Sequence, residues 1–524
     1  MVRSLTILEK IKENPRLLKT IRQGVERECL RVTSSFEVTN SDHPKGIGSK
    51  LTHPFITTDY SESLLEFITG VFSKSDDLVD NLSMMHDFTY QKIENDEYIW
   101  PWSMPAKVSM DDADIKVANF GSSNTGRLKE LYRVGLGHRY GKSMQSIAGV
   151  HFNFSFTDDF WNEYAKDFDS ALDLQEIKNQ GYFKLIRNYR RYSGLLMYLF
   201  GTTPVVHESF LKNKKHNLEK LGFETWGKKY ATSLRMGGLG YTSGAQDEIG
   251  ICYNALSTYI KTLERARLKS FPPYEKIGLK DENGFKQLNT NLLQIDNEFY
   301  SRVRPKNIAK SGQSALQALH ERGIEYVEVR LLDVNPFSAT GIEKEAMRFM
   351  HAFLLLCLCE ESPLIAKAEC IEIDENFLKI VNDGRDPKLM LAINNEPVSK
   401  DQFFNDLMIK ITPYIDLLDK AFETDKYKKA YVFQKEKLDD IEKLPSQKIL
   451  SLFDDKTSII DGIGKLAKDY KELGIGREYD SSWDAIAKDS IAKQRELEKD
   501  DEDFELYLKK YFDQIKINFE DDNV

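Results

Sequence analysis

The chain has 524 residues, of which 41% are hydrophobic and 30% charged, so it contains ample material for a globular core. Its formal net charge of −10 and its pI of about 5.6 argue against a nucleic-acid partner, because nucleic-acid binders present basic surfaces. The longest apolar run, residues 349–359, has eleven residues. A membrane-spanning helix needs about 20, so we expect no membrane partner.

The N-terminal sequence and the cysteines indicate where the protein works. "MVRSLTILEKIKENPRLLKTI" distributes its charges along an amphipathic helical rhythm, unlike a signal peptide. The cysteines are few, odd in number and scattered, which is typical of a reducing compartment. They are Cys29, Cys252, Cys357, Cys359 and Cys370. We therefore expect a cytoplasmic protein with structural thiols.

Strand-like and helical segments alternate between about residues 20 and 335. In chain order, the strand-like segments are 24–32, 64–71, 149–156, 287–295 and 324–332, and two clear helical segments are 75–95 and 182–201. Beyond about residue 342 the pattern is nearly all helical, with polar joints near 370–376 and 392–401. The pattern predicts an α+β fold that forms one catalytic body over 1–524. Residues 1–341 would carry the sheet and the active site, and 342–524 would be a mainly helical part packed onto it.

The C-terminal region is strongly acidic. Residues 480–524 contain 14 Asp or Glu and 7 Lys or Arg, a net charge of −7. We interpret this region as an exposed acidic helix and tail, with a partner-binding device as the alternative.

Several predicted strands carry acidic or imidazole side chains opposite an apolar face. Successive side chains of a strand point to opposite sides, so Glu26 and Glu28 share one face, as do His151 and Asn153. A solvated sheet normally mixes Lys, Thr, Gln and Ser on its wet face, whereas these segments repeat carboxylates. The charged residues placed on this face, or on the turn before it, are Glu26, Glu28, Asp59, Glu66, His151, Glu328 and Arg330.

Five carboxylates gathered in one cleft would repel one another strongly. At an effective dielectric near 20, each pair ~4 Å apart repels by roughly 4 kcal/mol. Divalent cations can offset this repulsion, and oxygen ligands with one imidazole suit Mg²⁺ or Mn²⁺ better than zinc. Mg²⁺ ions in an acidic cleft commonly hold nucleotide phosphates. The pattern therefore predicts a magnesium or manganese site that binds a nucleotide.

Two common nucleotide-binding motifs are absent from the sequence. There is no G-x-x-x-x-G-K-[ST], and no G-x-G-x-x-G follows a predicted strand. Neither a P-loop nor a dinucleotide-binding site is indicated. The glycine-rich stretch 235–244, "RMGGLGYTSG", could close over a ligand or could be an ordinary turn.

A series of motifs in one order resembles a known family. These are "GVERECLRV", "LTHPFITTDYSESLLEFIT", "YIWPWSMP", "NTGRLKELYRVGLGHRYG", "GVHFNFS", "YATSLR", "LGYTS" and "GIEYVEVRLLDVNPF". Together they resemble the proteobacterial type of glutamate–cysteine ligase, from residue 1 to beyond 480. The resemblance implies a fold similar to glutamine synthetase, in which a curved antiparallel sheet forms a funnel surrounded by helices. It also implies ATP-dependent joining of the γ-carboxylate of L-glutamate to the amino group of L-cysteine, the first step of glutathione synthesis.

The resemblance also implies roles for individual residues. The family's metal ligands correspond to Glu26, Glu28, Asp59, Glu66, His151 and Glu328. Its catalytic arginines beside the transferred phosphoryl group correspond to Arg235 and Arg330. The lining of its cysteine pocket corresponds to Tyr132, Tyr241 and Tyr300, and Gln145 and Asn153 are the residues expected to contact glutamate.

Three other functions remain compatible with the residues. The chain could be a ligase of similar architecture that activates glutamate but uses another amine. It could be a non-enzymatic protein that keeps the fold for binding, although such proteins usually lose some of the acids or arginines. It could also be a metal-dependent phosphohydrolase. A bifunctional glutathione-making fusion is not expected, because little sequence follows the ligase-like region.

Overall fold

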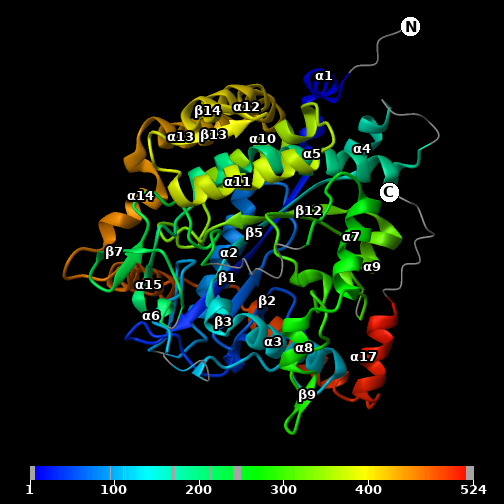
Figure 1. The fold of residues 1–524 in the computed structure, drawn as a ribbon, viewed down its shortest axis with the longest axis vertical. Helices are drawn as coiled ribbons and strands as arrows, with labels where there is room; N and C mark the ends of the chain where they lie inside the picture. The colour runs from blue at the N-terminus through cyan, green and yellow to red at the C-terminus, as the bar shows by residue number, and fades with distance from the viewer. Residues whose placement is uncertain are drawn as a thin grey trace.

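A seven-stranded sheet forms the centre of the protein (Figure 1). The computed structural model describes residues 6–94, 96–109, 111, 114–166, 172–212, 214–239, 249–310 and 312–514. In spatial order the strands are β11 (Val303–Lys306), β12 (Tyr326–Leu332), β5 (Val150–Phe156), β1 (Ile21–Val32), β3 (Leu64–Ile68) and β2 (Ile56–Thr58), and β4 (Tyr98–Ile99) pairs with β1. All pairs are antiparallel and the sheet is open, with β11 and β2 at its edges, which confirms the predicted α+β class.

One face of this sheet is mainly apolar, although β1 also buries Arg27 and Arg31 on it. Phe152 of β5 lies opposite Val25 of β1 on one side and Val329 of β12 on the other, and all three are buried. Full burial of each such side chain contributes roughly 1.5–3 kcal/mol. This face fixes the strand register, because a slip of one residue would move the carboxylates of the opposite face into the core.

Long helices cover the apolar face. Helix α5 (Leu174–Phe200) contacts β11 and β12, and α2 (Ser75–Tyr90) contacts β1. Helix α10 (Lys344–Cys359) packs against both α5 and α2, which explains the apolar run 349–359. Helices α12 (Lys400–Phe422) and α13 (Lys426–Asp439) pack outside α10, and α11 (Lys367–Asp383) packs against α5 (Figure 1).

Helix α3 (Asn124–Tyr140) belongs to the other side of the molecule, where α8 (Pro272–Ile277) and α17 (Phe504–Asp513) also lie (Figure 1). It begins where the Ser123 hydroxyl accepts a hydrogen bond from the Gly126 amide. It ends at Gly141, whose φ of 83° is readily adopted only by glycine. These two signals bound the motif "NTGRLKELYRVGLGHRY".

The remaining elements connect and flank these layers. The other helices are α1 (Ile7–Glu13), α4 (Asp158–Ala165), α6 (Glu208–Leu211), α7 (Leu256–Leu268), α9 (Ala315–Arg322), α14 (Pro445–Ile449), α15 (Ile459–Ile475) and α16 (Ser482–Leu497). A small sheet contains β6 (Val205–His207), β8 (Thr225–Gly227) and β7 (Glu219–Gly222). Two hairpins are β9 (Lys280–Asp281) with β10 (Gly284–Phe285), and β13 (Met390–Ile393) with β14 (Glu396–Ser399). In the part of the chain that the structure describes, no helix combines the length and apolarity required to cross a bilayer.

Two expectations about local structure are wrong. Residues 287–295 form no strand, because their amide side chains bond to the backbone instead: Gln294 Oε1 accepts from the Leu288 amide at 2.9 Å, and Asn289 Nδ2 donates to the Gln294 carbonyl at 3.0 Å. Residues 370–376 are no joint but lie inside α11, where Ile373 and Phe377 are buried one turn apart.

The acidic C-terminal region also differs from the expectation. Helix α17 buries Phe504, Leu508 and Tyr511 against the rest of the protein, so it is not an exposed acidic helix. Its amphipathic spacing was present within the acidic sequence. Residues 515–524 lie outside the described part of the chain.

Candidate active site

The strand register brings the predicted polar residues together on one face of the sheet. Glu26 of β1 lies directly opposite His151 of β5. Two residues along β1, Glu28 lies opposite Glu66 of β3. On the other side of β5, the backbone of Glu328 is paired with that of Asn153. Segments separated by hundreds of residues therefore contribute to one patch.

The carboxylates and the imidazole form two overlapping clusters. In one, ligand atoms of Glu26, His151 and Glu328 lie within 4.8 Å of one another, and in the other, those of Glu28, Glu66 and His151 do. His151 connects the clusters, since its Nδ1 is 3.2 Å from Glu26 Oε2 and its Nε2 is 3.6 Å from Glu28 Oε1. Two cation-sized sites that share one imidazole are the arrangement that this geometry allows.

Three basic side chains surround Glu328. Its Oε2 is 3.2 Å from Arg330 Nη1 and 4.0 Å from Arg304 Nη1, and its Oε1 is 3.6 Å from Lys306 Nζ. Burial alone would raise the pKa of Glu328, but Lys306 and Arg330 hold this pKa well below its usual range. Glu328 is therefore ionised in the protein at neutral pH.

In the second cluster the carboxyl pKa values are raised rather than lowered. Burial and the neighbouring Asp59 carboxylate raise the pKa of Glu28 to about 8. Burial and the carboxylates of Glu26 and Asp59 raise the pKa of Glu66 well above its usual range. At neutral pH, and without a bound cation, these two groups are largely protonated.

The donor set of both clusters fits a hard divalent cation. Carboxylate oxygens with a single imidazole are the ligands that Mg²⁺ and Mn²⁺ prefer. Within the described residues, Glu328 Oε2 is buried and accepts no hydrogen bond, despite its proximity to Arg330. A buried carboxylate oxygen with unused acceptor capacity is costly unless a ligand occupies it, so the residues present fit such an ion.

Arg235 donates hydrogen bonds to the backbone of β12, the strand that carries Arg330. Its Nη2 donates to the Arg330 carbonyl at 3.1 Å, and its Nη1 lies 3.5 Å from the buried Asp333 carboxylate. The neighbouring Gly149 must be glycine, since a Cβ there would collide with the Arg235 guanidinium. The Gly149 amide in turn donates to Glu28 Oε2 at 2.7 Å. Arg235 thus joins the carboxylate-bearing face of the sheet to the β12 arginine.

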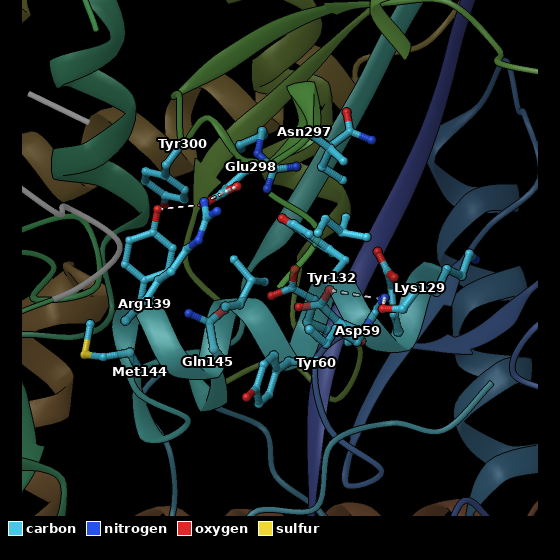
Figure 2. A pocket seen from close by; sticks show the side chains of 18 of the residues that line it. Asp59, Tyr60, Lys129, Tyr132, Arg139, Met144, Gln145, Asn297, Glu298 and Tyr300 are labelled. Carbon is cyan, nitrogen blue, oxygen red and sulfur yellow. Dashed lines mark hydrogen bonds and ion pairs between the residues drawn. The ribbon is translucent and has the colours of Figure 1, made fainter. Parts of the chain in front are cut away.

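These side chains open into a cavity of about 700 Å³. One face of α3 forms a long wall, because residues three or four apart project to the same side. The wall residues are Thr125, Leu128, Lys129, Tyr132, Arg133, Leu136, Arg139 and Tyr140. In Figure 2, Arg139 and Glu298 point toward one another, and their Nη1 and Oε1 atoms are 3.1 Å apart in a buried ion pair.

The other predicted site residues have different positions. Tyr132, Gln145 and Tyr300 line the cavity (Figure 2). Asn153 does not line the cavity, but its Nδ2 donates to Glu26 Oε1 at 2.9 Å. Tyr241 lies outside the described residues.

Asp59 lies at the edge of the site rather than inside either cluster. It lines the cavity, its side chain is 39% exposed, and Arg133 Nη2 is 4.0 Å from its Oδ1. Its carboxylate is close enough to Glu28 and Glu66 to raise both of their pKa values. Asp59 is thus available to a cation bound by the second cluster.

Sequence reasoning missed several residues of the cavity wall. Arg304 and Lys306 flank Glu328 from β11, and the basic alternation of "SRVRPK", residues 301–306, was the available signal. Pro305 argues against a strand there, but an edge strand such as β11 tolerates proline. Lys129, Arg133 and Arg139 lie on α3, and nothing in the sequence alone shows which face of that helix meets the sheet.

An antiparallel sheet that gathers buried carboxylates, an imidazole and two arginines at one cavity defines a metal-dependent enzyme for anionic substrates. The family model for glutamate-cysteine ligase matches residues 5–380. The glutamate–cysteine ligases of Pseudomonas syringae pv. syringae and Hahella chejuensis are 43% and 42% identical to the chain, over 95% and 96% of its length and 95% and 98% of theirs. The chain belongs to the glutamate–cysteine ligase family.

Solved structures agree with this assignment. A glutamate–cysteine ligase from Francisella tularensis, crystallised in complex with AMP, is 35% identical and superimposes with a TM-score of 0.88 over 95% of this chain and 98% of that one. A bifunctional glutathione synthetase from Pasteurella multocida shares the fold, with a TM-score of 0.72 and 23% identity. That match covers 92% of this chain but 58% of the longer protein.

Proposed function

We propose that this protein joins the γ-carboxylate of L-glutamate to the amino group of L-cysteine at the expense of ATP. The product is γ-glutamylcysteine, and the reaction is the first step of glutathione biosynthesis. The observation that carries the proposal is the pair of clusters around His151, next to Arg330, in a chain 43% identical over 95% of its length to a glutamate–cysteine ligase.

The clusters are the proposed binding sites for Mg²⁺ or Mn²⁺. Glu26, His151 and Glu328 would hold one ion, and Glu28, Glu66 and Asp59 would hold another beside the same imidazole. Bound divalent cations neutralise the phosphate oxygens of ATP and stabilise negative charge that develops on them. The ligands that the chain supplies are oxygen-rich, in agreement with this role.

The arginines account for the activation of glutamate. A carboxylate is a poor electrophile, so we propose that glutamate first takes the γ-phosphoryl group of ATP, which releases ADP and forms a γ-glutamyl phosphate. The cysteine amine then attacks the acyl carbon, displaces inorganic phosphate and loses a proton. The Nε of Arg330 is buried and donates no hydrogen bond within the described residues, so it is available to an anion in the cavity. Arg235 is held by main-chain carbonyls and positions the strand that carries Arg330. Planar guanidinium groups suit the transferred phosphoryl group better than ammonium groups.

The cavity wall supplies the proposed amino-acid sites. Tyr132 and Tyr300, together with Tyr241, would line the cysteine pocket, and Gln145 and Asn153 would contact glutamate. We further propose that the sheet curves into a funnel around these sites, and that residues 1–524 act as one catalytic body and a cytoplasmic monomer. The division of that body into 1–341 and 342–524 likewise stays a prediction.

The test is an amine panel with the purified protein, Mg²⁺-ATP and glutamate, in which ADP and product mass are measured. We expect ADP release to require cysteine, with 2-aminobutyrate accepted about 10–200-fold less efficiently, because an aromatic and apolar pocket separates near-isosteres only modestly. ADP formation without any amine would instead identify a phosphohydrolase. A different preferred amine would identify another ligase.

The raised pKa values predict that cation binding depends on pH. Glu28, with a pKa of about 8, and Glu66 are protonated in the cation-free protein at neutral pH and must lose protons to bind a metal. The affinity for Mg²⁺ should therefore increase as the pH rises from 6.5 to 8, by up to about tenfold per pH unit for each displaced proton. Titration calorimetry in two buffers of different ionisation enthalpy measures this proton release. An affinity that does not change over this pH range would contradict the prediction.

A further inference from the structure

Helix α17 contributes side chains to the active-site cavity, although it lies in the acidic C-terminal region. Tyr507 and Tyr511 both line the cavity, and only 9% of Tyr511 is exposed. Because they are four residues apart, both rings project from the same face of the helix. Two aromatic rings from the last described helix therefore belong to the wall of the site.

Apolar and cation–π contacts hold the first turns of α17. Phe504 and Leu508 form a small apolar cluster with Leu131 of α3 and Leu288. The guanidinium of Arg127 lies 4.0 Å from the centre of the Phe504 ring. These contacts hold the first turns of α17 against α3.

Two hydrogen bonds connect α17 and the residue after it to the rest of the protein. The Tyr507 hydroxyl is 3.3 Å from the Thr125 hydroxyl, and both residues line the cavity. Beyond the helix end, Gln514 Nε2 donates to the carbonyl of Gly312, in the loop that follows β11, at 3.0 Å. Helix α17 is thus held between α3 and the loop that follows β11.

The chemistry of the cavity changes in steps from the sheet to α17. The carboxylate clusters lie on the sheet, and Arg304 and Lys306 stand beside Glu328. Arg304 Nη2 donates to the Asn297 carbonyl at 2.9 Å, and Ile295 of the same segment packs against the α17 cluster. The wall next to α17 is apolar and aromatic, with the lining residues Leu128, Leu288, Ile295, Tyr507 and Tyr511.

The order of carboxylates, basic side chains and aromatic rings corresponds to the parts of a nucleotide bound with divalent cations. Divalent cations on the acids would hold the outer phosphates, and the basic side chains would neutralise the rest of the chain of phosphates. A purine base is flat and apolar on its faces, and it binds well against tyrosine rings. The side chain of cysteine is too small to require so large an apolar wall.

We propose that Tyr507 and Tyr511 form the binding face for the adenine base of ATP, so that helix α17 determines nucleotide affinity. This inference rests on the proposed ATP-dependent function but goes beyond it, because it assigns the base to residues far along the chain from the motifs that carry the family resemblance. It also gives the acidic C-terminal region a role in the site.

The test measures binding rather than turnover, using the full chain with Mg²⁺ and calorimetry. The probes are ADP and inorganic tripolyphosphate, which has the phosphates but no base. In the variants Tyr507→Leu and Tyr511→Leu, ADP affinity should fall about tenfold for each tyrosine, while tripolyphosphate affinity stays within about twofold. Tyr507→Phe and Tyr511→Phe keep the rings and should retain ADP affinity within about threefold.

The matched control is Leu506→Ala on the same helix, since 47% of Leu506 is exposed. It should change neither affinity. The inference is overturned if the leucine variants bind ADP normally, or if they lose tripolyphosphate binding equally, which would mean that α17 merely maintains the cavity. Its failure is separate from failure of the proposed function, because the wild-type protein would still bind ADP and form γ-glutamylcysteine.

Discussion

Replacing Arg330 by lysine should lower the turnover number by about 10²–10³-fold, the range observed when one donor to a developing anion is removed. Arg330 projects from β12, with its Nη1 3.2 Å from Glu328 and 3.4 Å from His151. These contacts orient the guanidinium, and Arg330 is one of the residues that line the cavity. Lysine keeps the positive charge beside Glu328 but offers one ammonium in place of a planar fork. Single-turnover measurements of ADP formation test the effect on the chemical step.

The matched control for this substitution is Arg191→Lys. Arg191 lies on α5 in the helical layer, where its Nε is 2.6 Å from Glu369, remote from the carboxylate clusters. We expect turnover within about twofold of the wild type, because Arg191 does not line the active-site cavity and lysine keeps its positive charge beside Glu369. If Arg330→Lys retained wild-type turnover with an intact fold, the guanidinium would have no role in phosphoryl transfer.

The central strands could be predicted from the sequence because their two faces differ sharply in chemistry. β1, β5 and β12 each alternate buried apolar residues with acidic or polar ones, and their positions are as expected. β11 could not be predicted, since Pro305 is disfavoured in strands and only its edge position makes it tolerable. The segment 287–295 has a strand-like composition, but its amide side chains compete for the backbone.

The acids of the site could be predicted for the same reason, and its walls could not. Alternation along one strand is a local property, so it identifies Glu26, Glu28 and Glu328 before any fold is known. Which face of α3 meets the sheet depends on how separate elements pack together. The same is true of α17, whose Tyr507 and Tyr511 reach the cavity only because Phe504 and Leu508 dock on α3.

The two clusters differ in charge before any cation binds, and this difference has a testable consequence. Burial and the neighbouring carboxylates raise the pKa of Glu66 well above its usual range, which favours its neutral form in the cation-free protein. Glu328, whose pKa is held well below it by Lys306 and Arg330, is ionised under the same conditions. Glutamine is a neutral isostere of glutamate. The same substitution therefore imitates the existing state of Glu66 but removes a charge at Glu328.

Glu66→Gln should accordingly leave the cation-free protein as stable as the wild type, or slightly more stable, because a protonated carboxyl is replaced by a neutral amide. Glu328→Gln should destabilise it by about 3–5 kcal/mol, since Arg304, Lys306 and Arg330 lose their buried counter-charge. Both variants should bind Mg²⁺ at least about 100-fold more weakly, because even residues that only support a metal ligand contribute 10–100-fold. Denaturant unfolding in EDTA measures the stabilities, and calorimetric titration measures the affinities.

Glu298→Gln provides the control, since Glu298 is a buried carboxylate in the same cavity wall that pairs with Arg139 rather than with either cluster. Its Mg²⁺ affinity should stay within about twofold of the wild type. Equal loss of cation-free stability in Glu66→Gln and Glu328→Gln would show that the two clusters share one charge state. Unchanged Mg²⁺ affinity in both would remove them from the ligand set, because a direct ligand cannot be neutralised without weakening the bond to its cation.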